Sequence, residues 1–247
     1  MTIVASYWWF TRPERTQSAP SGKPAVAVLY FDNNTGDTSL DWMRTGLTDM
    51  MVTDLSQSAH IEVLGTDRLV QILQDLKRVD DRVISADVVQ EVANRAGVDN
   101  VLVGSYVKAG DTIRIIARLQ EARTGRIVSA ERVEGSGEAS LFALVDELTR
   151  RFMAKMSELS GGRTASLISR PGVSPAEAGL DRGVTDITTS SIEAYRYYAE
   201  GMKFHERGMF VQAAPLLEKA IEIDPNFAMA LRQARCRQQQ HRPLQQA

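Results

Sequence analysis

Residues 101–133, VLVGSYVKAGDTIRIIARLQEARTGRIVSAERV, decide the fold class because they contain three strand-like segments in a row. The segments are 101–107, 112–120 and 126–133, and short connections containing glycine join them. Every second residue of the middle segment is apolar, as in a strand with one buried face: Ile113, Ile115, Ala117 and Leu119. Such short connections join antiparallel neighbours, so the sequence predicts a three-stranded antiparallel unit.

The segments on either side of this unit show strand and helix patterns. Residues 24–31, PAVAVLYF, form an apolar run followed by turn residues, which is typical of a buried strand, and a second short strand is expected at 61–64. Apolar residues at helical spacing predict four helices: 40–55, 66–78, 85–97 and 138–158. The order β-α-β-α-α-β-β-β-α predicts an α+β or α/β fold, with a mixed sheet of about five strands and helices packed on it.

Composition divides the chain into six segments. We expect the end of a transmembrane helix at 1–10, a linker at 11–23, the α/β domain at 24–159, a flexible linker at 160–190, a small all-α helical hairpin at 191–231 and a disordered tail at 232–247. The linkers are rich in Pro, Gly, Ser and Thr. The tail has arginines and glutamines but no acid, so it cannot form an apolar stripe.

The first ten residues, MTIVASYWWF, are apolar and end in aromatic residues, with Arg12 close behind. A membrane span needs about 20 apolar residues, so this is half of one. Aromatic residues followed by arginine are typical of the interfacial end of a spanning helix. The alternatives are a disordered or packed tail and an interfacial anchor.

Four stretches of the predicted α/β domain carry a family resemblance: 26–33 VAVLYFDN, 44–49 RTGLTD, 97–106 GVDNVLVGSY and 110–115 GDTIRI. They resemble the TolB-like amino-terminal domain of the FlgO/CsgG-related group. In bacteria such a domain often stands between a signalling module, such as a kinase, and tetratricopeptide (TPR) repeats. The resemblance implies a membrane-tethered signalling protein, and these motifs carry no catalytic constellation.

Residues 194–227, AYRYYAEGMKFHERGMFVQAAPLLEKAIEIDPNF, resemble one TPR unit. Seven residues fall at the spacing of the TPR pattern: Tyr197, Gly201, Phe204, Ala213, Leu217, Ala220 and Pro225. Two residues depart from it. Glu200 stands where an apolar residue is usual, and Pro215 is expected to delay or kink the second helix.

A single TPR unit cannot bury its own apolar face, and about three are needed for independent stability. We therefore expect the hairpin to bind or pack against protein, and part of that protein to lie outside this sequence. In TPR geometry the first helix lines the concave face, which makes four residues candidate partner contacts: Tyr195, Tyr198, Met202 and His205.

Composition and spacing argue against several other functions. The net charge is −2, and the arginines of the 112–133 hairpin alternate with acids and lack neighbouring aromatic residues, so no nucleic-acid partner is expected. The three histidines and one cysteine show no metal-ligand spacing, and His60 has no catalytic partner nearby. The 32–37 segment, DNNTGD, lacks the EF-hand and P-loop patterns and is interpreted as a turn and helix cap.

The sequence thus predicts a non-enzymatic protein-interaction or scaffold module without cofactors, in a membrane-associated bacterial signalling protein. A protein or peptide partner would bind through the TPR unit, and the expected location is the inner membrane with the soluble part on either side. One alternative is a small-molecule or nucleotide sensor that uses the sheet and the 32–37 loop. A remote alternative is an unrecognised hydrolase.

Overall fold

A computed structural model describes residues 23–59, 61–159 and 183–240 of the chain. The expected transmembrane end at 1–10, most of the following linker and His60 lie outside the described residues. The same holds for most of the 160–190 linker and for the last seven residues.

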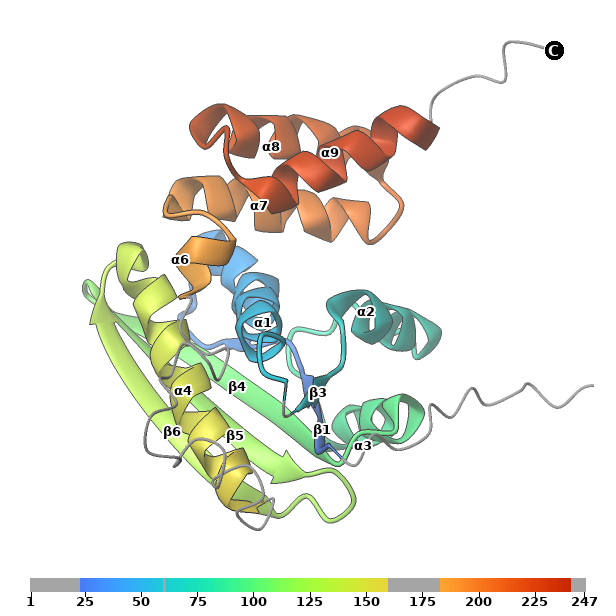
Figure 1. The fold of residues 1–247 in the computed structure, drawn as a ribbon, viewed down its shortest axis with the longest axis vertical. Coiled ribbons are helices and arrows are strands. Elements are labelled where there is room, and N and C mark those ends of the chain that lie inside the picture. The colour runs from blue at the N-terminus through green and yellow to red at the C-terminus, as the bar shows by residue number, and fades with distance from the viewer. Residues whose placement is uncertain (1–22, 60, 160–182, 241–247) are drawn as a thin grey trace, which may run out of the picture.

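A mixed six-stranded sheet forms the base of the α/β domain, which confirms the predicted fold class (Figure 1). The strands are β1 Ala25–Val28, β2 Asp32–Asn33, β3 Glu62–Val63, β4 Asn100–Ala109, β5 Thr112–Glu121 and β6 Ile127–Ser136. They are ordered β3-β1-β4-β5-β6, and β2 pairs with β4. The pairings of β1 with β3 and β4 are parallel, whereas β4, β5 and β6 are antiparallel as predicted.

The helices of the α/β domain follow the predicted pattern and are α1 Trp42–Leu55, α2 Thr66–Asp75, α3 Ala86–Ala96 and α4 Leu141–Leu159. The helices that follow this domain are α6 Val184–Ile187, α7 Ile192–His205, α8 Phe210–Ile223 and α9 Ala228–Gln240. The Asp37 carboxylate accepts a hydrogen bond from the Ser39 amide at 2.8 Å, which confirms the turn-and-cap interpretation of this segment. Gly97 ends α3 in the left-handed conformation, at φ 68°, as expected for its position.

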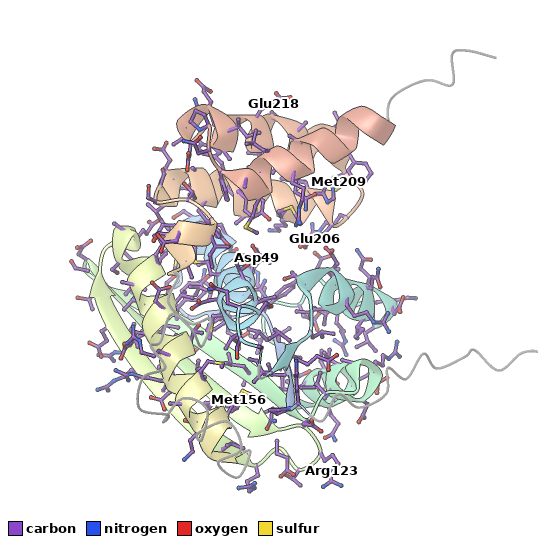
Figure 2. The ribbon with its side chains drawn as sticks, in the orientation of Figure 1. Asp49, Arg123, Met156, Glu206, Met209 and Glu218 are labelled. Carbon is purple, nitrogen blue, oxygen red and sulfur yellow. The ribbon has the colours of Figure 1, made fainter. Side chains whose placement is uncertain are left out.

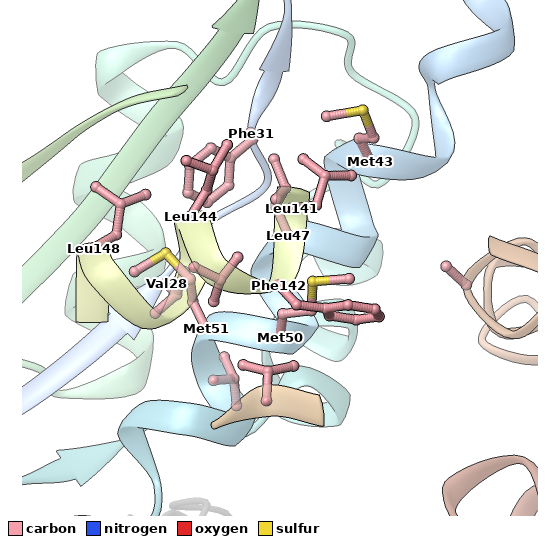
Figure 3. Close-up of a cluster of buried hydrophobic side chains, with 14 of the residues drawn as sticks. Val28, Phe31, Met43, Leu47, Met50, Met51, Leu141, Phe142, Leu144 and Leu148 are labelled. Carbon is pink, nitrogen blue, oxygen red and sulfur yellow. The ribbon is translucent and has the colours of Figure 1, made fainter. Parts of the chain in front are cut away.

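Each face of the sheet has its own hydrophobic core. Helices α2 and α3 cover one face around Ala27, Leu29 and Val101. Helices α1 and α4 cover the other face, where Val28 and Phe31 meet methionines and leucines of both helices (Figure 3). Since alternate strand residues point to opposite faces, the continuous apolar run of β1 supplies both cores.

The helical unit, defined here as α7, α8 and α9, lies on the outer side of α1 (Figure 1). The core that begins under α1 and α4 continues into this unit through Tyr195, Tyr198 and Phe227. The hairpin therefore stacks on α1 of the same chain, a packing partner that could not be recognised from the sequence. The physical reason is that α1 buries residues around most of its circumference, Trp42 and Gly46 among them, and so offers a second face for packing.

Two segments outside the α/β domain are more ordered than the sequence indicated. The end of the predicted flexible linker forms α6, where Val184 is buried and its amide donates to Asp146 Oδ1 at 2.9 Å. Helix α9 continues to Gln240, although the pattern was expected to fail after about residue 231. Arginine and glutamine are good helix formers, so the backbone continues without an apolar stripe.

Candidate functional site

The contact between α1 and α7 is built around one tyrosine. Tyr195 is fully buried, and its hydroxyl donates to Asp49 Oδ2 at 3.0 Å and lies 3.3 Å from the Gly46 carbonyl oxygen. A side chain at Gly46 would place its Cβ 3.5 Å from the Tyr195 ring and 3.2 Å from Trp42. The glycine therefore leaves the space in which α7 approaches α1.

Aromatic rings surround Tyr195 on its other sides. Phe142 of α4 meets it edge-on with ring centres 5.9 Å apart, and Phe227 stacks on it at 6.1 Å. Tyr198 lies 4.9 Å from the same Phe227 ring. The helical unit is thus attached to the α/β domain by aromatic packing, which is among the larger contributions that single side chains make.

Polar contacts flank this aromatic centre. The Gln74 side-chain amide at the end of α2 donates to the Glu206 carbonyl oxygen at 2.8 Å. At the same corner the Arg207 guanidinium forms an ion pair with Asp80. These contacts fix the end of α7 relative to α2 and to the loop that follows it.

The four predicted partner contacts occupy different environments. Tyr195 and Tyr198 are only 0% and 2% exposed, because α1 and Phe227 cover the face that was expected to meet a partner. Met202 is half-buried and lines a groove beside α1. His205 contacts Phe210 of α8 edge-on, with ring centres 5.1 Å apart.

The seven TPR-pattern residues lie at or near the α7–α8 contact. Gly201 faces Leu217, where an added Cβ would be 3.1 Å from the leucine side chain. Ala213 and Ala220 are buried, while Tyr197 and Phe204 are partly buried. Pro225 follows the end of α8. The arrangement is a close helical hairpin, and its assignment as a TPR unit remains a prediction.

The two departures from the TPR pattern have simple structural outcomes. Glu200 pairs with Arg196 at 3.2 Å on the surface of α7. Pro215 is exposed inside α8, and the helix begins at Phe210, so the delayed start expected from this proline is not seen. Because Val211, one turn earlier, is also exposed, water can reach the carbonyl group that a proline leaves unpaired.

A groove of about 190 Å³ remains between α1, α2, α7 and α9, and we call it the acidic groove. Asp49, Asp67 and Glu206 line it together with apolar Met202 and Met229 and a single arginine, Arg232. Figure 2 shows Asp49 and Glu206 in the layer between the helical unit and the α/β domain. Tyr198 also lines the groove, and its hydroxyl has no hydrogen-bond partner among the described residues.

Two carboxyl groups of the acidic groove, those of Glu206 and Asp49, have a raised pKa. Burial raises the pKa of Glu206 to about 8, and the charges of Asp49 and Asp67 add to the effect while Arg207 opposes it. Burial also raises the pKa of Asp49, although hydrogen bonds from Tyr195 and Thr66 lower it. A cation entering the groove would relieve this mutual repulsion.

A second cavity of about 140 Å³ adjoins the groove on the other side of Thr45 and Glu206, and we call it the basic cavity. Four cationic residues line it: Arg44 from α1, Arg82 from the α2–α3 loop, Lys203 from α7 and Arg207 from the α7–α8 corner. Tyr30, Asp41 and Asp80 complete the polar lining. The cavity therefore spans the two parts of the chain and has the opposite charge character from the groove.

Sequence reasoning missed most residues of this contact region. Gly46 and Asp49 lie on the second face of α1, at positions i+4 and i+7 from Trp42. That spacing was the available signal, but glycine and aspartate do not count as apolar in a periodicity pattern. Arg44 and Arg207 line the same cavity, but the sequence does not indicate this because they are far apart along the chain.

Other candidate features have ordinary structural roles. In the 32–37 loop, Asp32 accepts from the Ile84 amide at 3.3 Å, and the Asn33 amide donates to Asp41 Oδ1 at 2.7 Å.

Within residues 23–59, 61–159 and 183–240, no group of His, Cys, Asp and Glu side chains has the geometry to hold a metal ion. Across the same ranges, no helix is both long and apolar enough to cross a membrane.

The fold and this contact region define a mixed α/β domain joined to a small helical unit. Residues 12–110 match the family described as Curli production assembly/transport component CsgG. The match supports the predicted resemblance of the first domain to the CsgG-related group. This match ends before α7–α9, whose assignment as a TPR unit stays a prediction.

The curated relative is named "Putative adenylate cyclase 3", from Rhizobium meliloti (strain 1021). It is 29% identical over 234 residues, which are 90% of this chain and 36% of that protein. The chain thus spans about a third of the length of the curated relative it matches.

Two solved structures show a distant likeness. Lipoprotein GNA1162 from Neisseria meningitidis is 17% identical with a TM-score of 0.41, covering 53% of this chain and 99% of its own. The LpoB C-terminal domain from Escherichia coli is 16% identical with a TM-score of 0.35, covering 46% of this chain and 82% of its own.

Proposed function

We propose that the chain is a non-enzymatic protein-interaction module of a larger, membrane-associated bacterial signalling protein, and that it binds a protein partner at the acidic groove. The observation that carries this proposal is the unpartnered Tyr198 hydroxyl at a groove whose lining is part acidic and part apolar. The hydroxyl has no hydrogen-bond partner among the described residues and Tyr198 lines the groove, so it offers a donor and an acceptor to an incoming group.

The charge of the groove favours a partner segment that contributes lysine or arginine. Asp49 and Asp67 face one arginine, and beside them Glu206, whose pKa burial and these two charges raise to about 8, is mostly protonated at neutral pH. The long apolar stem of lysine or arginine fits beside Met202 and Met229, while its charged end reaches the carboxylates. The groove thus keeps part of the predicted concave binding face, although α1 covers Tyr195.

The test is selection of peptides on the immobilised full-length chain, followed by binding measurements with single variants. Enriched peptides should contain lysine or arginine and should bind about tenfold more weakly to Asp67→Asn, since a charge-assisted contact is lost. Asp87→Asn on α3 is the matched control, because Asp87 has the same chemistry and lies outside the groove. Enrichment that is equal on the wild-type and Asp67→Asn chains would exclude the groove as the binding site.

Photocrosslinking gives an independent measurement of the same site. A benzophenone amino acid at Met202 should crosslink the enriched peptide, whereas the same group at exposed Val83 should not. Crosslinking of equal yield at both positions would mean that the peptide binds without the groove.

The name of the curated relative raises a second activity, nucleotide cyclisation. We propose that the segment shared with that relative regulates or positions other parts of the longer protein, since it corresponds to about a third of its length. The purified chain is expected to form no cyclic AMP from ATP and Mg²⁺. Turnover that a single point variant abolishes would overturn this assignment and revive the enzymatic alternative.

A further inference from the structure

We propose that the basic cavity binds the phosphate group of a small ligand, and that the bound phosphate connects the helical unit to the α/β domain. The cavity is separate from the acidic groove and its proposed protein partner. Its lining comes from α1, the α2–α3 loop and the α7–α8 corner, so one ligand would contact all three.

Arg44 is the central group of this cavity. One of its terminal nitrogens, Nη2, donates to the Asp81 carbonyl oxygen at 2.5 Å, which fixes the guanidinium in position. Its Nε is buried and has no hydrogen-bond partner in the structure. A buried donor without a partner is costly on a charged group. Arg44 is also among the residues that line the cavity, so its positive charge would stabilise an anion held there.

Tyr30 supplies a further donor at the cavity. Its side chain is 3% exposed, it lines the cavity, and its hydroxyl has no hydrogen-bond partner among the described residues. Arg82 and Lys203 also line the cavity and form no ion pair within the part of the chain that the structure describes. Three cationic groups without an ion pair among the described residues, Arg44, Arg82 and Lys203, come from separate segments together with the Tyr30 hydroxyl. Such a set suits a dianion with several acceptor oxygens better than a single carboxylate.

The aspartates that line the cavity already have hydrogen-bond or ion-pair partners. Asp41 accepts from the Asn33 side-chain amide at 2.7 Å, and Asp80 forms the ion pair with Arg207. Burial raises the pKa of Glu206 to about 8, so at neutral pH this carboxyl group is mostly protonated and can itself donate. The cavity therefore has an excess of positive charge and of hydrogen-bond donors.

The size of the cavity defines what it accommodates. Sites for whole drug-sized ligands usually measure about 300–1,000 Å³. A cavity of about 140 Å³ fits a phosphate group with little attached to it inside. Inorganic phosphate and a phosphomonoester whose remaining part extends into solvent share this chemistry.

The test is thermal unfolding and isothermal titration of the full-length chain with inorganic phosphate, phenyl phosphate and AMP, against sodium chloride at equal ionic strength. We expect at least one phosphate compound to bind and to raise the melting temperature beyond the chloride control. Tighter binding of phenyl phosphate and AMP would identify a phosphomonoester as the source, and tighter binding of inorganic phosphate would identify the free ion.

Three variants locate the site. Arg44→Met and Arg82→Met should each weaken binding about tenfold or more, and Tyr30→Phe should weaken it a few-fold. Arg82 is exposed, so its variant should fold even where loss of Arg44 destabilises the chain. Arg95→Met on α3 is the matched control, because Arg95 pairs with Glu91 away from the cavity. No phosphate-specific binding by the wild-type chain, or equal loss in Arg95→Met and Arg82→Met, would overturn the proposal.

Discussion

The α/β domain and the helical unit bury their apolar residues in different ways. The sheet is covered on both faces by helices of its own domain, with α2 and α3 on one side and α1 and α4 on the other. The helical unit has only three helices, and its central aromatic residue, Tyr195, completes its surroundings with Phe142 and Gly46 of the α/β domain. One part is therefore internally complete, whereas the other depends on a neighbour.

This difference explains where polar groups and cavities gather. The contact with the helical unit includes a buried polar pair, since the Tyr195 hydroxyl donates to Asp49. The acidic groove and the basic cavity both lie along this same contact and share Thr45 and Glu206. Changes at the contact should therefore act on stability and on binding together.

The largest expected effect comes from removing the aromatic centre of the contact. Tyr195→Ala should lower the free energy of unfolding by about 3–5 kcal/mol, because it leaves a cavity and deprives Asp49 of a hydrogen bond. Urea denaturation of the full chain followed by circular dichroism measures this. Tyr197→Ala, at a half-buried position on the same helix, is the control and should cost less. Equal losses would show that the helical unit does not depend on α1.

A pair of glycines compares the two parts directly. In Gly104→Ala the new Cβ would lie 2.2 Å from the Phe31 ring and 3.0 Å from the Ile116 carbonyl oxygen, so the sheet must distort, and we expect a loss of about 1–3 kcal/mol. In Gly201→Ala it would lie 3.1 Å from the Leu217 side chain and 3.4 Å from the Ala213 carbonyl oxygen, a milder crowding, and alanine favours the helix by up to about 1 kcal/mol. The second variant should therefore change stability little.

Thermal unfolding of both variants decides this comparison. A larger loss in Gly201→Ala than in Gly104→Ala would mean that the helical hairpin is the more tightly packed part. That result would contradict the view that the α/β domain is internally complete.

Most of the α/β domain could be predicted because its signals are local. Alternating apolar residues in β5, helical spacing in α2 and α3, and the capping roles of Asp37 and Gly97 depend only on neighbouring residues. The two-residue strand β2 escaped prediction because a pattern of period two needs a longer run to be visible. The continuation of α9 was missed because its residues favour a helix without forming an apolar stripe.

The contact region could not be predicted because it depends on residues distant in sequence. Tyr195 was predicted to contact a partner on the concave face, and nothing in its neighbourhood in the sequence indicates that α1 of the same chain covers it. The acidic groove joins Asp49, Asp67 and Glu206, and local patterns carry no information about such a grouping. Long-range placement, not residue chemistry, limited the prediction of the site.

The stability of the folded chain should depend on pH through Glu206, which lies at the contact between the two parts. Its pKa is raised from 4.5 to about 8, so between these values the folded chain holds a proton that the unfolded chain has lost. Stability should therefore be highest below about pH 4.5 for this group and should decrease as the pH rises through 8, by on the order of 1 kcal/mol because the open groove is partly screened by solvent.

Melting temperatures from pH 5 to pH 9 measure this contribution. Glu206→Gln should flatten the decrease, and Glu193→Gln, at an exposed position on the same helix, should leave it unchanged. A Glu206→Gln profile that still follows the wild type would place the raised pKa elsewhere.

The smallest effect is expected at the ion pair between the two parts. Asp80→Asn removes the partner of Arg207 and should cost no more than about 1 kcal/mol, because the Asp80 side chain is 72% exposed. Exposed ion pairs also lose strength as salt screens them, so the difference from wild type should shrink between 0.05 and about 0.5 M sodium chloride. Urea denaturation at both salt concentrations gives the two values.

Comparing the stability losses of Asp80→Asn and Tyr195→Ala shows which contact attaches the helical unit to the α/β domain. If aromatic burial attaches the helical unit, loss of an exposed ion pair leaves the contact intact, and only the end of α7 becomes less fixed. A loss at Asp80 as large as that at Tyr195, persisting at high salt, would mean that the α7–α8 corner holds the unit in place. The basic cavity at that corner would then be the structural centre of the contact, and a phosphate ligand there would control whether the two parts stay together.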